Sequence, residues 1–439
     1  MERDLVSSYS STFDGENYNK ALVIIMDQFP FDKLLRMRRL LNEIKPYKPI
    51  IKKCEVEHIP TLTEPGHAAI ATGRRMWENG IVGDCWFRRK PPGLVKFNGN
   101  ISYLTSPTIS DIACINGFKT ICISGKRNVT SLLGNSMFLP EDTKEKALGF
   151  DPSSALVLSK NSLNPTPDSG EWIALVAEIC LEKYFNSIER WCLIVSFSNL
   201  DIVGHKYGID SERYERELLN VEDLIINLLL KVNLTDTLVI IVSDHGATQL
   251  KSIVRINKSR KYFEFYELYN GVEKLFDERK IPDFIVRNTY YLDGLIPDGG
   301  SFRVYLEKQE PEDINKAKNE FLSVFEGYID PLGIYDFQSP IYGHIQTRDK
   351  RNGDLIMIVK KGIGFLREEW RNIFTVHGSN HEEDKIVPLL ILDPKDMLTE
   401  YVNKPMLKQV EIAPIISQCL GLKVNSKYLS KVIYANKPS

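Results

Sequence analysis

The sequence predicts an α/β protein in which a mainly parallel sheet lies between helices and a smaller cap subdomain is inserted. Short apolar runs without polar alternation are typical of strands that are buried on both faces. Helical patterns separate these runs, as in successive βαβ units. The chain has 439 residues, of which 43% are hydrophobic, and it exceeds the size at which a single core usually stops growing. We therefore expect one large domain with a substantial insertion, or two domains.

Four apolar runs are expected to be strands of the central sheet, and each ends at a charged or polar residue. They are KALVIIMD (20–27), FKTICISGK (118–126), WCLIVSFSNLD (191–201) and DTLVIIVSDH (236–245). Three segments with helical patterns accompany them: 33–45, 170–188 and 213–232. This alternation of strands and helices predicts parallel pairing with helices on both faces of the sheet.

A block rich in Tyr, Lys, Asp and Gly interrupts this pattern and is interpreted as the cap. It contains short strands at 262–271 and 301–309 and a helix at 310–328 with Pro in its first turn. We assign 18–254 and 351–436 to the catalytic core and 255–350 to the cap. Core strands are expected again at 353–362, 375–384 and 385–394, followed by a closing helix at 409–423 with Gly421 near its C-cap.

Composition makes several classes of partner improbable. A formal charge of -2 and a pI of about 6.4 do not favour binding to a nucleic-acid duplex. The polar first twenty residues lack the apolar region of a secretory signal, and no apolar run reaches the length of a membrane span. Seven scattered cysteines without a CxxC pair indicate free thiols and a cytoplasmic protein. The oligomeric state is not indicated.

Acidic and imidazole side chains collect where the predicted strands end. Ligands of open α/β sheets bind at these carboxyl ends, so we expect the side chains to meet there. The set consists of Asp27, Asp201, His205, Asp244, His245 and His377. Mixed oxygen and nitrogen ligands suit Zn²⁺ or a similar divalent ion, whereas Ca²⁺ and Mg²⁺ prefer oxygen alone.

Each of these residues also has an ordinary structural interpretation. Asp27 alone is more often a helix N-cap, and Asp201 with His205 forms an i, i+4 pair that is common on helix surfaces. His377 alone is a hydrogen-bonded loop histidine. The joint pattern is stronger because it uses three of only seven histidines, with His381 as a rival to His377. The remaining histidines are His58, His67 and His344.

The segment TEPGHAAIATG (63–73) predicts a short helix beside this ligand set. Thr63 is expected as its N-cap, Pro65 lies in its first turn and Gly73 at its C-cap. Free N–H groups and the helix dipole favour a phosphate at such a terminus. A hydroxyl in this place becomes a nucleophile when a coordinating metal lowers its pKa. Without the ligand set, a simple capping threonine is the better interpretation.

These motifs together resemble the alkaline phosphatase superfamily, in particular type I phosphodiesterases and nucleotide pyrophosphatases. Related members are phosphonoacetate hydrolase and threonine-type phosphomonoesterases. The motifs occur in the family's order: a strand-end Asp, T-x-P-x-H with a later TG, G-I-V-G, D-x-x-x-H, S-D-H-G and a late H-G-S. Sulfatases share the fold but require a C/S-x-P-x-R motif, which this chain lacks.

The resemblance implies a site with two divalent ions, most probably Zn²⁺ with Mn²⁺ or Fe as alternatives. It makes Thr63 the nucleophile and an additional metal ligand. By the same resemblance, Asp27, Asp244 and His245 hold one ion with Thr63. The other ion is held by Asp201, His205 and His377. The implied fold is alkaline-phosphatase-like, with a cap that shapes substrate choice.

Two positions concern the substrate. Relatives usually have Asn after the G-I-x-G motif, where it donates to a phosphoryl oxygen, but this chain has Asp84. An ionised carboxylate only accepts, so Asp84 is either protonated or faces a cation, an amine or a hydroxyl. Lys126 matches the first of two basic residues that grip terminal oxygens in related monoesterases, while Asn128 stands at the second. Trp86 and Phe87 form either an aromatic wall or core packing.

The expected function is hydrolysis of phosphodiesters or nucleotide pyrophosphates through a phospho-threonine on Thr63, with a small phosphate ester or nucleotide as substrate. One alternative is a phosphomonoesterase or phosphonate hydrolase on the same two-metal site, which Lys126 favours. Another is a non-catalytic, metal-containing binding protein, which Asp84 suggests.

Overall fold

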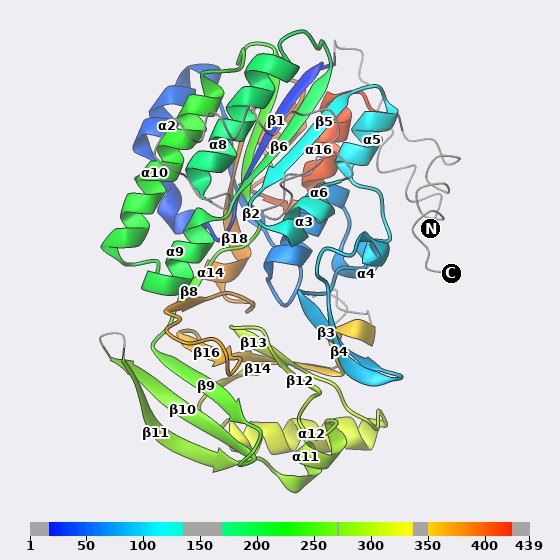
Figure 1. Ribbon diagram of the computed structural model, residues 1–439, viewed down its shortest axis with the longest axis vertical. Coiled ribbons are helices and arrows are strands. Elements are labelled where there is room, and N and C mark those ends of the chain that lie inside the picture. The colour runs from blue at the N-terminus through cyan, green and yellow to red at the C-terminus, as the bar shows by residue number, and fades with distance from the viewer. Residues whose placement is uncertain (1–16, 135–168, 270–271, 337–349, 424–439) are drawn as a thin grey trace.

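The computed structural model describes residues 17–134, 169–269, 272–336 and 350–423. A seven-stranded sheet forms its centre (Figure 1). The strand order is β19 (Met406–Lys408), β2 (Ile50–Glu55), β18 (Ile386–Leu392), β7 (Thr237–Ser243), β1 (Lys20–Met26), β6 (Trp191–Phe197), β5 (Lys119–Ser124). Strand β18 is antiparallel to both neighbours, and the other pairs are parallel, which confirms the mainly parallel sheet.

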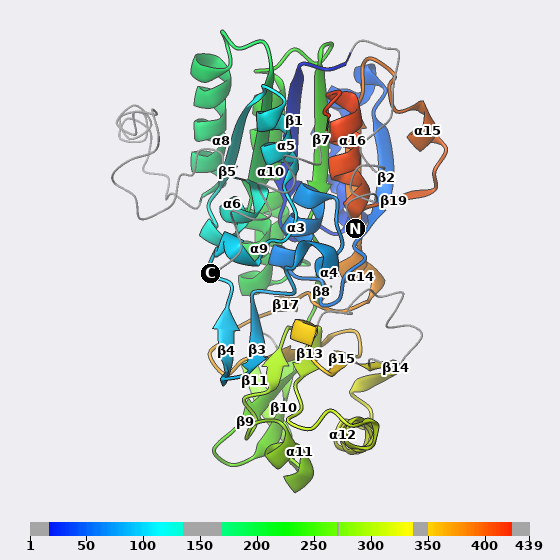
Figure 2. The same ribbon diagram turned by 90° about the vertical axis from the view of Figure 1, so that its right-hand side faces the viewer.

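Helices cover both faces of this sheet because both faces of its strands are apolar. One face packs against α2 (Arg38–Ile44), α8 (Gly170–Ile179) and α10 (Glu212–Leu229). The opposite face packs against α3 (Thr63–Thr72), α5 (Ile109–Ile115), α6 (Arg127–Leu133) and α16 (Ile412–Cys419). Within β1, Leu22 and Ile24 face the first layer, while Val23 and Ile25 face the second. Figures 1 and 2 show the two helical layers on either side of the sheet.

Two four-stranded sheets lie below the main sheet in Figure 1 and form the cap. The first has the order β11 (Val272–Lys280), β10 (Tyr262–Tyr269), β9 (Ser252–Asn257), β16 (Ile363–Leu366). The second has the order β12 (Leu295–Pro297), β13 (Ser301–Val304), β15 (Leu355–Val359), β14 (Ile329–Asp336). Helices α11 (Asp283–Asn288) and α12 (Pro311–Val324) pack on them around buried phenylalanines. Pro311 occupies the first turn of α12, as expected.

The assignment of residues 353–362 to the core was wrong for β15. This strand pairs with β13 and β14 of the cap, and the following β16 pairs with β9. Leu355, Met357 and Phe365 pack in the apolar cluster of the cap. A continuous apolar run predicts a buried strand but does not tell which of two cores buries it.

The remaining short strands and helices lie between or beside these larger elements. They are β3 (Cys85–Arg89) with β4 (Pro92–Lys96), β8 (Thr248–Gln249) with β17 (Thr375–Val376), α4 (Met76–Asn79), α9 (Asn199–Tyr207), α14 (Glu382–Lys385) and α15 (Thr399–Val402). The 3₁₀ turns are η1 (Phe31–Arg36), η2 (Lys45–Tyr47), η3 (Ile101–Tyr103), η5 (Lys350–Asn352) and η6 (Gln409–Glu411), and η4 (Cys180–Tyr184) is a π turn. The strand expected at 375–384 is limited to its first two residues. Among the described helices, none combines the length and apolar character needed to span a bilayer.

A buried arginine ties the cap to the core. Arg303 of β13 is fully buried and forms a two-point ion pair with Asp298, with distances of 2.7 and 2.9 Å. It also donates to the carbonyl oxygens of Val82 (3.3 Å) and Cys85 (2.8 Å), in the core segment that precedes and begins β3. Arg303 and Asp298 are both removed from water. The two-point ion pair and the two carbonyl acceptors offset the cost of burying these charges.

Candidate metal centre

Acidic and imidazole residues meet at the carboxyl edge of the main sheet. Asp27 directly follows β1, and Asp244 with His245 directly follows β7. Asp201 and His205 lie one turn apart on α9, which follows β6. Because β6, β1 and β7 are parallel neighbours, their carboxyl ends bring these five side chains to one place.

His377 reaches the same place from a distant part of the chain. It follows β17, whose residue Val376 pairs with Thr248 of β8, just beyond the end of β7. The ring of His377 stacks on His245 with a centroid distance of 3.8 Å and lies 5.3 Å from the ring of His205. The structure thus brings together all six side chains of the ligand set, which we call the ligand cluster.

Distances within the ligand cluster suit shared coordination. Nε2 of His245 lies 3.3 Å from Oδ2 of Asp244 and 3.6 Å from Oδ1 of Asp27. Oδ1 of Asp201 lies 3.1 Å from Nε2 of His205 and 3.9 Å from Nε2 of His377. Two triads have ligand atoms within 4.8 Å of one another: Asp27, Asp244 and His245, and Asp201, His245 and His377. His245 therefore lies between the two halves of the cluster.

All three imidazoles are oriented in the same manner. Each ring places Nδ1 against a backbone carbonyl oxygen, which only accepts, so Nδ1 carries a proton and Nε2 is the nitrogen that faces the cluster. The pairs are His205 with Thr375 (2.7 Å), His245 with Gly246 (2.9 Å) and His377 with Thr61 (2.9 Å). Metal-binding histidines are typically held by such contacts at the other nitrogen.

The carboxylates retain acceptor capacity that the chain does not satisfy. Oδ1 of Asp27, Oδ1 of Asp201 and Oδ2 of Asp244 are buried and, among the described residues, accept no hydrogen bond of suitable geometry, although imidazole nitrogens lie 3.6, 3.1 and 3.2 Å away. Buried anionic oxygens without partners are costly unless a cation neutralises them. Unpaired carboxylate oxygens that face imidazole nitrogens therefore fit a divalent metal.

Protonation in the cluster is set by burial and by mutual charge. Burial and the neighbouring Asp244 raise the pKa of Asp27 well above its ordinary value. Burial opposes ionisation of Asp201, but Lys126 and His205 hold its pKa well below the ordinary value. Burial and the adjacent imidazoles lower the pKa of His377, which keeps this ring neutral as coordination requires.

Thr63 faces the ligand cluster from the first turn of α3. Its Oγ1 lies 3.1 Å from Nε2 of His245. The predicted N-cap role was wrong: Leu62 occupies that position with extended backbone, Thr63 begins the helix, and its hydroxyl makes no capping bond. Gly66 allows α3 to approach the sheet, because a Cβ there would lie 2.6 Å from the backbone oxygen of Asp244.

His67 is a functional neighbour that the sequence interpretation left unassigned. Its Nδ1 lies 2.9 Å from the backbone oxygen of Thr63 and 3.2 Å from Oδ2 of Asp244, and its Nε2 lies 2.9 Å from Oγ of Ser196. The ring is fully buried and links the nucleophile candidate to a ligand candidate. The i, i+4 spacing from Thr63 on a helix was the available signal.

The other histidines lie outside the ligand cluster. His381, the rival to His377, directs Nε2 to the backbone oxygen of Val359 at 2.8 Å and belongs to neither triad. Burial and the nearby His245 lower the pKa of His58 to about 3, so this buried ring is neutral. His344 lies outside the described residues.

Lys126 inserts its ammonium group into the cluster. It precedes α6 at the end of β5, and its Nζ lies 2.5 Å from Oδ2 of Asp27 and 2.7 Å from Oδ2 of Asp201. Asn128 donates instead to Glu64, at 3.4 Å. Lys126 therefore bridges the two halves of the cluster, and the basic pair of the related monoesterases is reduced to one cation.

Asp84 faces a cation that comes from the cap. Nη2 of Arg367 lies 3.0 Å from Oδ1 and 2.9 Å from Oδ2 of Asp84. Burial, and then the charge of Asp84, raise the pKa of the buried Glu64 to about 7. The negative charge of Asp84 therefore acts on the first turn of α3, where Glu64 lies. Asp84 was expected to be either protonated or placed opposite a cation, an amine or a hydroxyl. The structure favours a carboxylate that is paired with the cation of Arg367.

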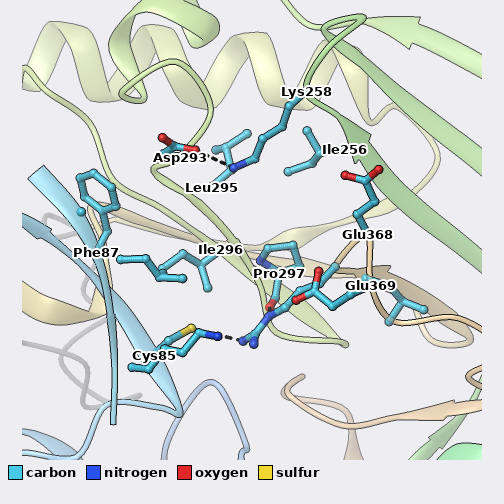
Figure 3. Close-up of a pocket in the computed structure, with 15 residues that line it drawn as sticks. Cys85, Phe87, Ile256, Lys258, Asp293, Leu295, Ile296, Pro297, Glu368 and Glu369 are labelled. Atoms are coloured by element: carbon cyan, nitrogen blue, oxygen red, sulfur yellow. Dashed lines mark hydrogen bonds and ion pairs between the residues drawn. The ribbon is translucent and has the colours of Figure 1, made fainter. Parts of the chain in front are cut away.

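A cavity of about 460 Å³ opens beside this ion pair, between the β3–β4 hairpin and the cap (Figure 3). Phe87, Leu295 and Ile296 contribute apolar surface, and Lys258 with Asp293 contributes charge. Arg367 and Cys85 also line it, so it borders the Asp84 position. Phe87 lines this cavity and, like the neighbouring Trp86, also packs in a buried apolar cluster.

Solved structures share this fold. Phosphonoacetate hydrolase from Sinorhizobium meliloti 1021, in complex with phosphonoformate, superimposes with a TM-score of 0.67 at 15% identity, covering 93% of this chain and 98% of that one. Wild-type alkaline phosphatase PafA has a TM-score of 0.65 at 16% identity, covering 93% of this chain and 97% of that one. A search of curated protein sequences gave no match.

The chain therefore has the alkaline-phosphatase-like fold that phosphonoacetate hydrolase and PafA share. A family model described as type I phosphodiesterase / nucleotide pyrophosphatase matches residues 21–380, which is most of the chain. The chain belongs to this family.

Proposed function

We propose that the protein hydrolyses phosphodiesters or nucleotide pyrophosphates of small molecules through a covalent intermediate on Thr63. The observation that carries the proposal is the position of Oγ1 of Thr63, 3.1 Å from Nε2 of His245 and at the N-terminus of α3. An activated hydroxyl beside free N–H groups is suited to attack on a phosphoryl group that those groups hold.

Two divalent ions, with Zn²⁺ as the first candidate, are the cofactors that the ligand cluster suits. Asp27, Asp244 and His245 would hold one together with Thr63, and Asp201, His205 and His377 would hold the other. Bound ions supply charge neutralisation for a phosphoryl group and lower the pKa of hydroxyl ligands. The buried unpaired carboxylate oxygens and the uniform imidazole orientation support this assignment.

The chain's own groups then perform the transfer. Oγ1 of Thr63 loses its proton to solvent and forms a bond to phosphorus, while the bond from phosphorus to the leaving oxygen breaks. From a diester the leaving alkoxide takes up a proton and departs as an alcohol, and from a pyrophosphate the leaving group departs as a phosphate. Water hydrolyses the ester on Thr63 and restores the hydroxyl. His67 contacts both the backbone oxygen of Thr63 and the carboxylate of Asp244, and so holds them in fixed positions relative to each other.

Charges around the phosphoryl position favour a diester over a monoester. A diester carries one negative charge, whereas an ionised monoester carries two. Lys126 is engaged by Asp27 and Asp201, and Glu64, which directly follows Thr63, lies within the electrostatic influence of Asp84. A dianion would meet little unneutralised positive charge from these side chains.

A monoesterase or phosphonate hydrolase is the second candidate. Lys126 supports it, because an ammonium released from its carboxylates by bound ions would be available to a terminal oxygen.

The seven free thiols support the expected reducing cytoplasm as the location.

Turnover of bis(p-nitrophenyl) phosphate and p-nitrophenyl phosphate by the metal-loaded protein tests the proposal. Thr63→Ala should abolish release of nitrophenol, Thr63→Ser should retain part of it, and Thr72→Ala, at the other end of the same helix, should leave it near wild type. Mass spectrometry after acid quench should find the retained group on Thr63. Full activity of Thr63→Ala would exclude the mechanism, and faster monoester cleavage would favour the second candidate.

A further inference from the structure

The Asp84–Arg367 contact joins the core to the cap, and Asp84 lies close enough for its charge to act on Glu64, which directly follows Thr63. Asp84 lies between the G-I-V-G segment and β3, and Arg367 directly follows β16. Nη2 of Arg367 contacts both carboxylate oxygens and lies 3.3 Å from Sγ of Cys85. The side chain of Arg367 is 18% exposed and that of Asp84 33%, so both reach solvent-accessible space.

Two of the three guanidinium nitrogens of Arg367, Nε and Nη2, form hydrogen bonds with other residues. Nε donates to the backbone oxygen of Pro297 at 3.3 Å, and the group lies over the ring of Trp370 at 4.7 Å. Among the described residues, no hydrogen-bond acceptor is found for Nη1. A planar guanidinium with two nitrogens anchored presents its third nitrogen in a defined direction. Arg367 therefore offers an oriented donor to a ligand.

The charge of this pair decides which ligand it suits. Relatives were expected to place an amide here, which donates to a phosphoryl oxygen without net charge. Asp84 alone would repel that oxygen, but Asp84 with Arg367 is neutral as a pair and still donates. A neutral donor favours a singly charged phosphodiester without adding the excess positive charge that would favour a dianion.

The cavity beside Arg367 offers room for an organic group. Its volume of about 460 Å³ lies within the range of small-molecule sites. Phe87, Leu295 and Ile296 supply buried apolar surface, and Lys258 pairs with Asp293 at 2.7 Å (Figure 3). The exposed side chains of Leu94, Lys96, Glu368 and Glu369 also line the cavity. The buried apolar part of the lining accommodates an uncharged, largely apolar ester group.

We propose that Arg367 is a specificity-determining residue that binds a phosphoryl oxygen through Nη1, and that the adjacent cavity receives a bulky apolar ester group of the diester. This inference rests on the proposed function and narrows its substrate class to phosphodiesters with at least one aryl-sized ester group. Asp84 acts as the positioning residue that holds the guanidinium.

Isothermal titration calorimetry measures the binding of phosphodiesters to the metal-loaded Thr63→Ala protein, which does not turn them over. It tests both the role of Arg367 and the role of the cavity. Diphenyl phosphate and dimethyl phosphate carry the same charge, but only the first fills the cavity. In this background, Arg367→Ala should weaken binding of both about 10- to 100-fold, because a hydrogen bond to a charged group is lost. Arg367→Lys should retain part of it, since one ammonium cannot reproduce the fork. Leu94→Trp should weaken diphenyl phosphate about tenfold more than dimethyl phosphate.

Leu219→Trp on α10 is the matched control, because Leu219 (49% exposed) resembles Leu94 (53% exposed) but lies away from the cavity. Asp84→Ala supplies no donor of its own and releases the guanidinium, so it should shift the affinity in the same direction as Arg367→Ala, and the double variant should show less than the sum of the two effects. Thermal melting of each variant separates lost binding from lost folding.

The inference is overturned if folded Arg367→Ala and Arg367→Lys bind both diesters as the parent does, or if Leu94→Trp weakens both ligands equally. Failure of the proposed function gives a different result: the otherwise unaltered metal-loaded protein would not cleave bis(p-nitrophenyl) phosphate. In that case the calorimetric measurements still decide whether Arg367 and the cavity bind aryl diesters.

Discussion

Nζ of Lys126 lies 2.5 Å from Oδ2 of Asp27, and the same nitrogen lies 2.7 Å from Oδ2 of Asp201. One ammonium thus joins carboxylates that belong to opposite halves of the ligand cluster. Despite burial, Asp201 and Asp27 raise the pKa of Lys126 far above its ordinary value, so this nitrogen stays charged. Lys126 places positive charge where bound cations would also place it, and the two compete for the same oxygens.

Replacing Lys126 should therefore strengthen metal binding. In Lys126→Met the competing ammonium is gone, and we expect the dissociation constant for Zn²⁺ to fall about tenfold, which corresponds to about 1.4 kcal/mol. Isothermal titration of the metal-free protein measures this directly. Lys119→Met, at the exposed start of the same strand, is the control. Unchanged or weaker Zn²⁺ binding in Lys126→Met would contradict the competition.

His67 should contribute to metal affinity without being a ligand. His67→Ala removes the contact that positions Oδ2 of Asp244, and losses of this kind typically cost 10- to 100-fold in affinity. Competition with a chromophoric chelator provides the measurement. His381→Ala serves as the control, since His381 contacts Val359 outside the cluster. Equal affinities for the two variants would show that His67 has no positioning role.

Gly66→Ala should destabilise the protein although alanine favours helices. The added Cβ would lie 2.6 Å from the backbone oxygen of Asp244, and overpacking of this kind typically costs about 1–3 kcal/mol. Gly93→Ala is a matched control, because a Cβ there meets nothing within 4 Å. Urea unfolding compares the two variants with the parent. A Gly66→Ala protein as stable as Gly93→Ala would mean that α3 can move away from the sheet freely.

Glu64 should make stability depend on pH near neutrality. Burial, and then the charge of Asp84, raise its pKa from an ordinary 4.5 to about 7 in the folded protein. The folded state therefore holds this proton more tightly than the unfolded state does. Its contribution is complete below about pH 4.5 and is lost as the pH rises through 7.

Glu64→Gln removes this loss, so the variant should gain stability relative to the parent as the pH rises from 4.5 to 7. The gain at pH 8 should reach at most about 3 kcal/mol. Urea unfolding at pH 5 and pH 8 in EDTA measures it, with the exposed Glu326→Gln as control. A stability difference that does not change with pH would refute the assignment.

Removal of metal should lower the melting temperature of the protein. Binding to the native state alone stabilises it by about 2.7 kcal/mol when the ligand is at 100 times its dissociation constant. Differential scanning calorimetry with EDTA, and then with Zn²⁺ restored, tests this. Asp244→Asn should show a much smaller response to Zn²⁺, because one of the unpaired carboxylate oxygens is lost. An identical response would mean that the stabilising ion binds elsewhere.

The sequence predicted the parts of the fold that depend on local pattern. Apolar runs located β1, β5, β6 and β7, and their terminal residues located most of the ligand cluster, because parallel strands end at one edge. The same reasoning failed for β15, since a buried strand looks alike in the core and in the cap. Residues that act through long-range contacts were also missed. No local signal connects Arg367 to Asp84, which precedes it by 283 positions.

The burial of Arg303 has a consequence for how this enzyme can be altered. Its guanidinium satisfies carbonyl groups at Val82 and Cys85, on either side of Asp84. The cap and residues 82–85 are therefore expected to move together as one rigid unit, without a hinge between them. A chimaera that exchanged only the cap for that of a relative would leave those carbonyls without donors. Successful exchange would have to carry the segment around residues 82–85 along with the cap.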